Sequence, residues 1–405
     1  MNSIAVIFPG QGSHFVGMYK GLYDQYEIVR QTILEAEQVT GVNIRELCFQ
    51  GPASLLNRPE NAHVAIVAFG VAAFRAFVSE SGQVPQFCAG HSLGEYTALV
   101  SAGAVSFSDA LKLVQLRSRI STKIKEDLNG GMSIIDGINT SVAERICRQQ
   151  RANGKKVYIS CYNSNKQIAI SGINEHLEET EDILRKCNGR TTPLFHSAPF
   201  HSPLMEEAIQ NFSEAAESVP FYESRYIVMS NYTGKPYRNL SEYSRNLVLH
   251  LTNPVRFDCI MQYLERMLVD KVIDFSARSI FEEMLSELPY SFKSFGTKEG
   301  REDLLSELGR AGNTEFLSKC ILTAITEPNC NPLSDYESNV RDPICQLYLI
   351  KEKLENNTLA DSSEVRAQSI HLLKKVFEGK GTDKKLQKKY IDQIVEESAE
   401  NYNLI

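Results

Sequence analysis

Short runs of β-branched and apolar residues alternate, in the first part of the chain, with longer stretches whose apolar positions recur at helical spacing. Ile4–Phe8 is such a run and predicts a buried strand, and Val84–Ala89 predicts another. A helical pattern begins directly after the second run, at Glu95–Val100. This alternation is typical of a parallel sheet with helices on both faces. We therefore predict an α/β fold.

The pattern changes between residues 129 and 198. Its periodicity predicts, in order, a strand, a helix, two strands, a helix and a strand: Met132–Gly137, Ser141–Gln150, Val157–Tyr162, Gln167–Ser171, Glu175–Cys187 and Thr191–Phe195. This β-α-β-β-α-β order is the ferredoxin-like motif. We therefore expect a small subdomain at 129–198, inserted into a core formed by residues 1–128 and 199–288.

The remainder, residues 289–405, is charge-rich and predicts a helical C-terminal extension. Asp361–Glu364 resembles a capping box at the start of a helix, and apolar residues follow on one face. The last predicted helix carries a basic cluster of Lys384, Lys385, Lys388 and Lys389. This cluster is best interpreted as a solvated face, and the alternative is a docking surface for an acidic partner.

Composition sets limits on the class of protein. The 405 residues are 42% hydrophobic and 23% charged, as in an ordinary globular protein, and the net charge of −7 argues against nucleic-acid binding. No segment approaches the roughly 18 uninterrupted apolar residues that favour a membrane span, and no signal peptide is evident. The nine cysteines are scattered and form no Cys-x-x-Cys pair, so we expect reduced thiols, no metal site and a cytoplasmic location.

The strongest chemical signal is Gly90–Gly94, a Gly-x-Ser-x-Gly pattern between a predicted strand and a predicted helix. The pattern often arises by chance, but this context is that of a nucleophile elbow, which makes Ser92 a candidate nucleophile. A candidate base is His201, which Pro199 and Pro203 flank. A lone histidine is more often structural than catalytic, so spacing alone does not settle its role.

Three motifs in this order resemble those of the malonyl-CoA:acyl-carrier-protein transacylase family: Pro9–Ser13, Gly90–Glu95 and Phe200–Met205. The resemblance covers about residues 1–288 and leaves out the extension. It implies an α/β-hydrolase-like large subdomain with a ferredoxin-like insert. It also implies malonyl-CoA as substrate, an acyl carrier protein as partner and no bound cofactor.

The resemblance assigns the reacting groups. Ser92 matches the nucleophile and His201 its general base, while the backbone amides of Gln11 and Leu93 match the oxyanion hole. In this family a backbone carbonyl orients the histidine, and the corresponding segment places that carbonyl near Arg256.

The resemblance also suggests the acyl group. Arg117 matches the arginine that pairs with the malonyl carboxylate, whereas Arg119 would point away from it. The alternative for Arg117 is a surface position on an amphipathic helix. Phe200 matches the residue that goes with malonyl rather than a branched unit, because its ring would fill the space of a 2-methyl group.

Some positions depart from the family pattern. His63 stands where the family usually has a glutamine near the pocket, and His14 likewise replaces a glutamine. A tolerated polar replacement and a change of acyl specificity are about equally compatible with His63. Asn163 and Arg256 complete the candidate substrate-binding residues.

We therefore expect a discrete acyltransferase that works by a ping-pong mechanism through an acyl-Ser92 ester. An added helical extension favours polyketide synthesis in trans over fatty-acid synthesis. Three alternatives stay open: a hydrolase that clears stalled acyl carrier proteins, a transferase for another carboxylated extender unit such as hydroxymalonyl, and a carrier-binding module without catalysis. The intact Ser92 and His201 argue against the last.

Overall fold

A computed structural model describes residues 3–194, 196–285, 290–308, 315–327, 329–331, 335–356 and 358–400. The chain forms two compact units. Unit 1 consists of Met1–Gln25, Ala36–Ala73 and Pro85–Arg301, and unit 2 consists of Tyr26–Glu35, Phe74–Val84 and Glu302–Ile405. All of the candidate site residues lie in unit 1.

Unit 1 contains a six-stranded sheet of order β11-β10-β1-β2-β7-β8. The first five strands in this order pair in parallel, and β8 is an antiparallel edge strand. The strands are β1 (Ile4–Phe8), β2 (Phe87–Gly90), β7 (Ile227–Ser230), β8 (Lys235–Pro236), β10 (Lys271–Asp274) and β11 (Ser291–Ser294). Because β1 and β2 are fully buried, they read as continuous apolar runs, as central parallel strands do.

Helices surround this sheet, and α6 (Gly94–Ser101) packs against β1, β2 and β7 with almost every residue buried. The other helices of unit 1 are α1 (Lys20–Gln25), α3 (Ile44–Phe49), α4 (Ala53–Leu56), α7 (Phe107–Leu128), α10 (Ala208–Ser218), α11 (Ser241–Leu249), α12 (Phe257–Arg266), α13 (Ile280–Met284) and the 3-10 turn η1 (Pro203–Met205). Three helices contribute to both units: α2 (Glu27–Thr40), α5 (Pro59–Ser81) and α14 (Lys298–Leu308).

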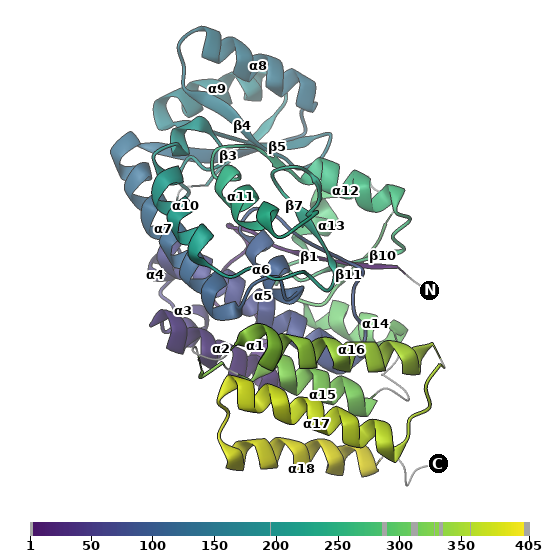
Figure 1. The fold of residues 1–405 in the computed structure, drawn as a ribbon. Coiled ribbons are helices and arrows are strands. Elements are labelled where there is room, and N and C mark those ends of the chain that lie inside the picture. The colour runs from purple at the N-terminus through teal and green to yellow at the C-terminus, as the bar shows by residue number, and fades with distance from the viewer. Residues whose placement is uncertain are drawn as a thin grey trace. The chain divides into compact units, whose positions relative to one another are not determined.

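The second sheet of unit 1 has the order β6-β3-β5-β4-β9. Its elements are β3 (Gly130–Asp136), α8 (Thr140–Ala152), β4 (Val157–Tyr162), β5 (Gln167–Ile173), α9 (Asn174–Lys186) and β6 (Arg190–Pro193), and β9 (Val255–Arg256) is added at the edge. Figure 1 shows α8 and α9 side by side on one face of this sheet. The predicted α/β class with a ferredoxin-like second subdomain is confirmed, although Phe195 at the end of the last predicted strand lies outside the described residues.

Two short strands depart from the expected subdomain boundaries. β9 follows the insert in sequence but pairs in parallel with β4, so the large core contributes a strand to the small sheet. β11 pairs in parallel with β10, so the large sheet continues beyond residue 288. The expected boundary at residues 288 and 289 itself lies outside the described residues.

Unit 2 contains the helical C-terminal extension that the sequence predicts. Its helices are α15 (Glu315–Thr326), the π-helical turn η2 (Glu337–Arg341), α16 (Asp342–Glu355), α17 (Ser363–Lys380) and α18 (Lys384–Glu400). Ser362 caps α17 by accepting a hydrogen bond from the Val365 amide, and Gly381 ends that helix in the left-handed conformation. A buried cluster that includes Leu347, Leu373 and Phe377 forms a core of its own.

Helix α5 is long and apolar enough to cross a membrane, but 94% of its most apolar window is buried inside the protein. That burial is typical of a central helix in a globular core.

Candidate active site

Ser92 lies at the tip of a sharp turn between β2 and α6. Its φ of +51° is in the left-handed region, which is uncommon for a residue with a side chain. The flanking glycines are required by close approach: a Cβ at Gly90 would lie 2.0 Å from the carbonyl carbon of Gly94, and one at Gly94 would lie 2.2 Å from the Phe8 oxygen. The turn therefore holds the Ser92 hydroxyl away from the chain, as a nucleophile elbow does.

His201 reaches this serine from a distant loop. Its Nε2 lies 2.7 Å from Ser92 Oγ, and its Nδ1 lies 2.6 Å from the carbonyl oxygen of His250. Because a carbonyl oxygen only accepts, Nδ1 carries the proton and Nε2 presents a lone pair to the serine hydroxyl. Burial, followed by charges on His250 and Arg117, lowers the pKa of His201 well below 6.5. The imidazole is therefore a neutral acceptor at neutral pH.

The carbonyl that orients His201 was expected near Arg256, and this expectation is wrong. His250 is the C-terminal cap of α11, where backbone carbonyls lack helical partners and are free to accept. Arg256 lies on β9 instead. Its guanidinium pairs with Asp258 at 3.0 Å and lies over the ring of Tyr162.

Two backbone amides after the carboxyl ends of the neighbouring strands β1 and β2 are available. Within the described part of the chain, the amides of Gln11 and Leu93 donate no hydrogen bond. Leu93 is the residue that caps the N-terminus of α6, where helix amides point outward and the dipole favours negative charge. The Ser92 amide is already used, since it donates to Asn231 Oδ1 at 3.1 Å.

Arg117 is a buried cation next to the serine. It extends from α7, is 4% exposed, and places Nη2 3.4 Å from Ser92 Oγ. Its guanidinium carbon lies 3.9 Å from the centre of the Phe200 ring. Its buried Nη1 has no hydrogen-bond partner among the described residues. Because an uncompensated buried charge is costly, this arrangement can accept an anionic group of a ligand.

His63 and Phe200 lie close to this arginine. The His63 ring is 6.2 Å from the Phe200 ring, and its Nδ1 lies 2.7 Å from Ser118 Oγ. The Ser118 hydroxyl gives its one proton to the Val114 carbonyl, so His63 Nδ1 is the donor in that contact. Burial lowers the pKa of His63 well below 6.5, and Nε2 is left as a neutral acceptor with no partner in the described structure.

Asn163 connects the elbow to the small sheet. Its Oδ1 lies 2.7 Å from His91 Nε2, and its Nδ2 donates to Gln167 at 2.8 Å. His91 directly precedes Ser92, so this contact holds the base of the turn from the side of the insert.

A buried network behind the serine and the histidine was missed by the sequence reasoning. The side chain of Asn231 accepts a hydrogen bond from the Ser92 backbone amide and donates one to the Gly90 carbonyl at 2.7 Å. The backbone amide of Asn231 donates to the Glu95 carboxyl at 2.9 Å. Tyr237 donates to the same Glu95 oxygen at 2.7 Å. Glu95 stands in the elbow motif, but the other two are far away in sequence and carry no pattern that could reveal them.

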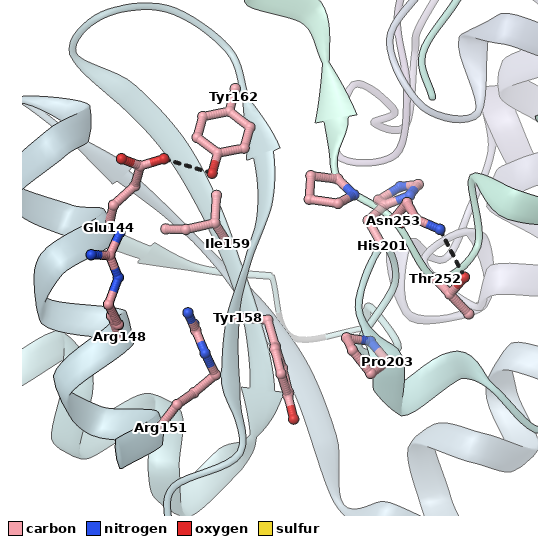
Figure 2. Close-up of a pocket in the computed structure, with 11 residues that line it drawn as sticks. Glu144, Arg148, Arg151, Tyr158, Ile159, Tyr162, His201, Pro203, Thr252 and Asn253 are labelled. Carbon is pink, nitrogen blue, oxygen red and sulfur yellow. Dashed lines mark hydrogen bonds between the residues drawn. The ribbon is translucent and has the colours of Figure 1, made fainter. Parts of the chain in front are cut away.

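Two cavities open beside the site. One of about 510 Å³ is lined by the Gln11 turn, His91 and Asn163. The other, of about 350 Å³, is lined by His201, by loop residues 252–254 and by side chains of α8 and β4, as Figure 2 shows. The candidate residues Ser92, His201, Arg117, Phe200 and His63 thus meet at one place, whereas Arg256 faces Tyr162 and Asp258.

Comparison with known proteins agrees with this geometry. The acyl transferase domain family matches residues 6–293. The chain belongs to this family. The acyltransferase is 31% identical over 391 residues to the malonyl CoA-acyl carrier protein transacylase of Bacillus subtilis. The alignment covers 94% of this chain and 97% of the relative. That alignment is longer than the family match, so it also takes in much of the extension.

Two further similar proteins have names that refer to polyketide synthesis. It is 33% identical over 264 residues to the polyketide biosynthesis protein PksE of Bacillus subtilis strain 168, covering 63% of this chain and 33% of the relative. Its structure also resembles that of a malonyl transacylase solved in complex with a type II polyketide acyl carrier protein (PlMCAT:AntF). The TM-score is 0.72 at 29% sequence identity, and the match covers 75% of this chain and 99% of that transacylase. The family resemblance noted in the sequence is confirmed.

Proposed function

We propose that the acyltransferase moves a malonyl unit from malonyl-CoA to the phosphopantetheine thiol of an acyl carrier protein, through a malonyl ester of Ser92. In the first half-reaction, Ser92 Oγ attacks the thioester carbonyl while His201 Nε2 takes the hydroxyl proton. The amides of Gln11 and Leu93 stabilise the oxyanion, an interaction that strengthens as charge develops. The carbon–sulfur bond then breaks, and coenzyme A leaves as the thiol with the proton from His201.

The second half-reaction reverses these roles. The carrier thiol attacks the malonyl-Ser92 carbonyl, and His201 takes the thiol proton. The ester bond breaks, the proton returns to the serine oxygen, and the thioester on the carrier is released. The acyl group waits on the enzyme between the two steps, which gives ping-pong kinetics.

One observation favours a malonyl group over an uncharged acyl chain: Arg117 is buried 3.4 Å from Ser92 Oγ with one nitrogen unpartnered among the described residues. A carboxylate at the far end of the acyl group would supply the missing partner and bind the planar guanidinium through two hydrogen bonds. A hydrolase of stalled acyl chains has no use for such a cation. A module that only binds the carrier has no use for the aligned Ser92 and His201.

A second candidate acyl group rests on His63. Its unpartnered Nε2 is an acceptor, and Phe200 and Arg117 lie nearby. An extender unit that carries both a carboxylate and a hydroxyl donor, such as hydroxymalonyl, would satisfy both Arg117 and His63.

We place the reaction in polyketide synthesis in trans and in the cytoplasm. PksE and the transacylase bound to a polyketide carrier support the assignment to polyketide synthesis. The extension by itself does not distinguish the two pathways, because the malonyl CoA-acyl carrier protein transacylase of Bacillus subtilis also aligns with it. The nine free cysteines are consistent with the reducing conditions of a cytoplasm.

Intact-mass measurement tests the proposal. The protein is incubated with malonyl-, hydroxymalonyl-, methylmalonyl- or acetyl-CoA, and then with holo carrier protein, with Ser92→Ala as the control that forms no adduct. We expect a malonyl adduct that moves to the carrier. An adduct that decays to free acid in the presence of carrier would identify a hydrolase, and no adduct at all would contradict the transferase assignment.

A further inference from the structure

The strained turn at Ser92 needs more than its glycines to keep its shape. Ser92 has a φ of +51°, a left-handed conformation that a residue with a side chain keeps only where its surroundings enforce it. Gly90 and Gly94 permit the turn, since a Cβ on either would collide with backbone atoms. Glycine also reaches many other conformations, so these two residues allow this geometry without selecting it. A further contact is therefore required to fix the turn.

Asn231 supplies this contact from a segment far away in the sequence. Its side-chain Oδ1 accepts a hydrogen bond from the Ser92 amide at 3.1 Å, and its Nδ2 donates to the Gly90 carbonyl at 2.7 Å. Asparagine carries an acceptor and a donor on one planar group, so it can bridge an amide and a carbonyl of the same turn. The bridge spans His91 and fixes the backbone on both sides of it. It thereby also sets the direction of the next amide, that of Leu93, the proposed oxyanion donor.

The backbone of Asn231 is itself fixed on two sides. The residue directly follows β7 and is 0% exposed. Its amide donates to Glu95 Oε1 at 2.9 Å, and its carbonyl accepts a hydrogen bond from the Arg256 amide at 2.8 Å. Glu95 belongs to α6, and Arg256 belongs to β9, which pairs with β4 at the edge of the second sheet. The place of Asn231 is therefore set by the helix after the elbow and by the edge strand of the second sheet.

The second sheet also holds the turn at another point. Asn163 follows β4, and its Oδ1 lies 2.7 Å from Nε2 of His91. Two asparagines thus engage three consecutive residues, 90, 91 and 92, and both are connected to the β4–β9 edge of the second sheet. His91 and Asn163 line the cavity that contains the Gln11 turn, where the proposed mechanism places the thioester carbonyl. These contacts therefore hold the nucleophile in register with both walls of the site.

We propose that Asn231 is a positioning residue for Ser92, which holds the turn in its left-handed conformation and ties it to β9. The inference rests on the proposed function and adds to it a residue that acts on the reaction through the backbone of the turn. Asn231 sets the distance and angle between Ser92 Oγ and His201 Nε2. A misplacement of about 1 Å between reacting groups can cost about a hundredfold in rate.

Two substitutions and one matched control test this role. Asn231→Ala removes both side-chain hydrogen bonds to the turn. Asn231→Asp keeps the size of the side chain and an acceptor for the Ser92 amide but loses the donor to Gly90, and it replaces the alanine variant if that protein does not fold. Asn246→Ala is the control, because Asn246 is another buried asparagine, whose Nδ2 donates to Ser230 Oγ of β7 at 3.3 Å.

Acylation of Ser92 is followed by rapid quenching and intact mass over a range of malonyl-CoA concentrations. We expect the rate constant at saturation to fall by about a hundredfold in Asn231→Ala and by about tenfold in Asn231→Asp. The half-saturating concentration should change by less than about threefold, because the groups that bind the ligand stay in place. Asn246→Ala should keep both values within about threefold of the parent protein.

The fraction of protein that reacts distinguishes positioning from a purely structural role. A residue needed only for folding lowers the fraction that is acylated and leaves the rate constant of that fraction unchanged. Three results would overturn the inference: a parent-like rate constant in a folded Asn231 variant, a loss confined to the reacting fraction, or an equal fall of the rate constant in Asn246→Ala.

Phenylmethylsulfonyl fluoride separates this inference from the proposed function, because it reacts with a serine nucleophile and carries no malonyl group. Ser92 Oγ bonds to the sulfur, the sulfur–fluorine bond breaks, fluoride leaves, and His201 takes the hydroxyl proton. We expect the two Asn231 variants to be labelled more slowly than the parent protein and Asn246→Ala, even if malonyl-CoA does not acylate Ser92. Equal labelling rate constants in all four proteins would contradict the positioning role.

Discussion

The imidazole of His250 lies face to face with that of His201, with ring centroids 4.4 Å apart, and the carbonyl of the same residue accepts the His201 Nδ1 proton at 2.6 Å. The backbone and the side chain of one residue therefore both contact the proposed general base. His250 Nδ1 also lies 3.0 Å from Glu95 Oε2, although the two atoms are not aligned as a hydrogen bond. Through Glu95 and Asn231, this residue is connected to the backbone of the serine turn.

The two roles of His250 can be separated. His250→Ala keeps the carbonyl and removes the ring, so we expect Ser92 acylation by malonyl-CoA to slow by less than about tenfold, as for loss of a packing contact. His201→Ala removes the base, and we expect a loss of at least about a thousandfold. Single-turnover acylation followed by mass spectrometry measures both. Equal losses would mean that the His250 imidazole itself is required.

Arg117→Ala removes the proposed carboxylate partner. We expect kcat/KM for malonyl-CoA to fall by about a hundredfold or more, because a charge-assisted pair in a buried site is lost. Acylation by acetyl-CoA has no carboxylate to lose and should change little. Arg119→Ala, at an exposed position two residues further along α7, is the matched control. If Arg117→Ala lowers malonyl and acetyl transfer equally, the arginine supports the site without binding the carboxylate.

Phe200→Ala opens the space beside the acyl group. The ring is 2% exposed and lies between Arg117 and His63, so its removal should admit a 2-methyl group. We expect the preference for malonyl over methylmalonyl to fall by about 1–3 kcal/mol, the usual value of one methyl group in a pocket. Competition between the two CoA esters, followed by intact mass, reads out the ratio directly. An unchanged ratio would mean that Phe200 does not limit the pocket.

The sequence predicted the local elements well because each depends on neighbouring residues. The order of strands and helices in the insert, the strand at Ile4–Phe8 and the elbow at Ser92 all follow from short patterns. The contacts that cross the chain could not be predicted in the same way. Asn231 meets the Ser92 amide across 139 residues, and β9 joins a sheet formed by an earlier segment.

The orienting carbonyl shows the same limit at a single atom. Any residue in the loop that follows α11 presents a carbonyl, so the residue type carries no information on which one faces His201. Tertiary packing selects His250, six residues before Arg256. The arginine was an informative residue in the sequence, but its side chain is engaged by Asp258.

Acidification should destabilise the fold. Burial, as the largest cause, lowers the pKa of His63, His201 and His250 well below 6.5 and also lowers the pKa values of His14 and His91. The unfolded chain therefore takes up protons below pH 6.5 that the folded state does not, and stability is lost as the pH falls toward the folded pKa values.

Three buried carboxyls act in the opposite direction. Burial raises the pKa of Glu95 to about 7, that of Asp274 to about 6 and that of Glu327 above its ordinary value, so their contribution to the stability of the fold decreases as the pH rises. Five histidines outnumber three carboxyls, and we expect a net loss of roughly 1 kcal/mol or more per pH unit below 6.5. Urea unfolding at pH 7.5, 6.5 and 5.5 measures this slope. His250→Gln should reduce it and the exposed His371→Gln should not; an equal slope in all three proteins would contradict the assignment.

The extension should not be removable as a separate tail. Unit 2 includes residues 26–35 and 74–84, so parts of α2 and α5 belong to the same compact body as the C-terminal helices. Ile33 and Phe77 in these segments are fully buried, and Lys351 of α16 donates a hydrogen bond to the carbonyl of Gly82. Deletion of residues 302–405 leaves this unit without most of its core, and we expect an aggregated protein with no Ser92 acylation. The measurement is the soluble yield and the malonyl adduct of the shortened chain. A soluble truncated protein that is acylated like the full chain would show that the extension is dispensable for folding and serves another purpose.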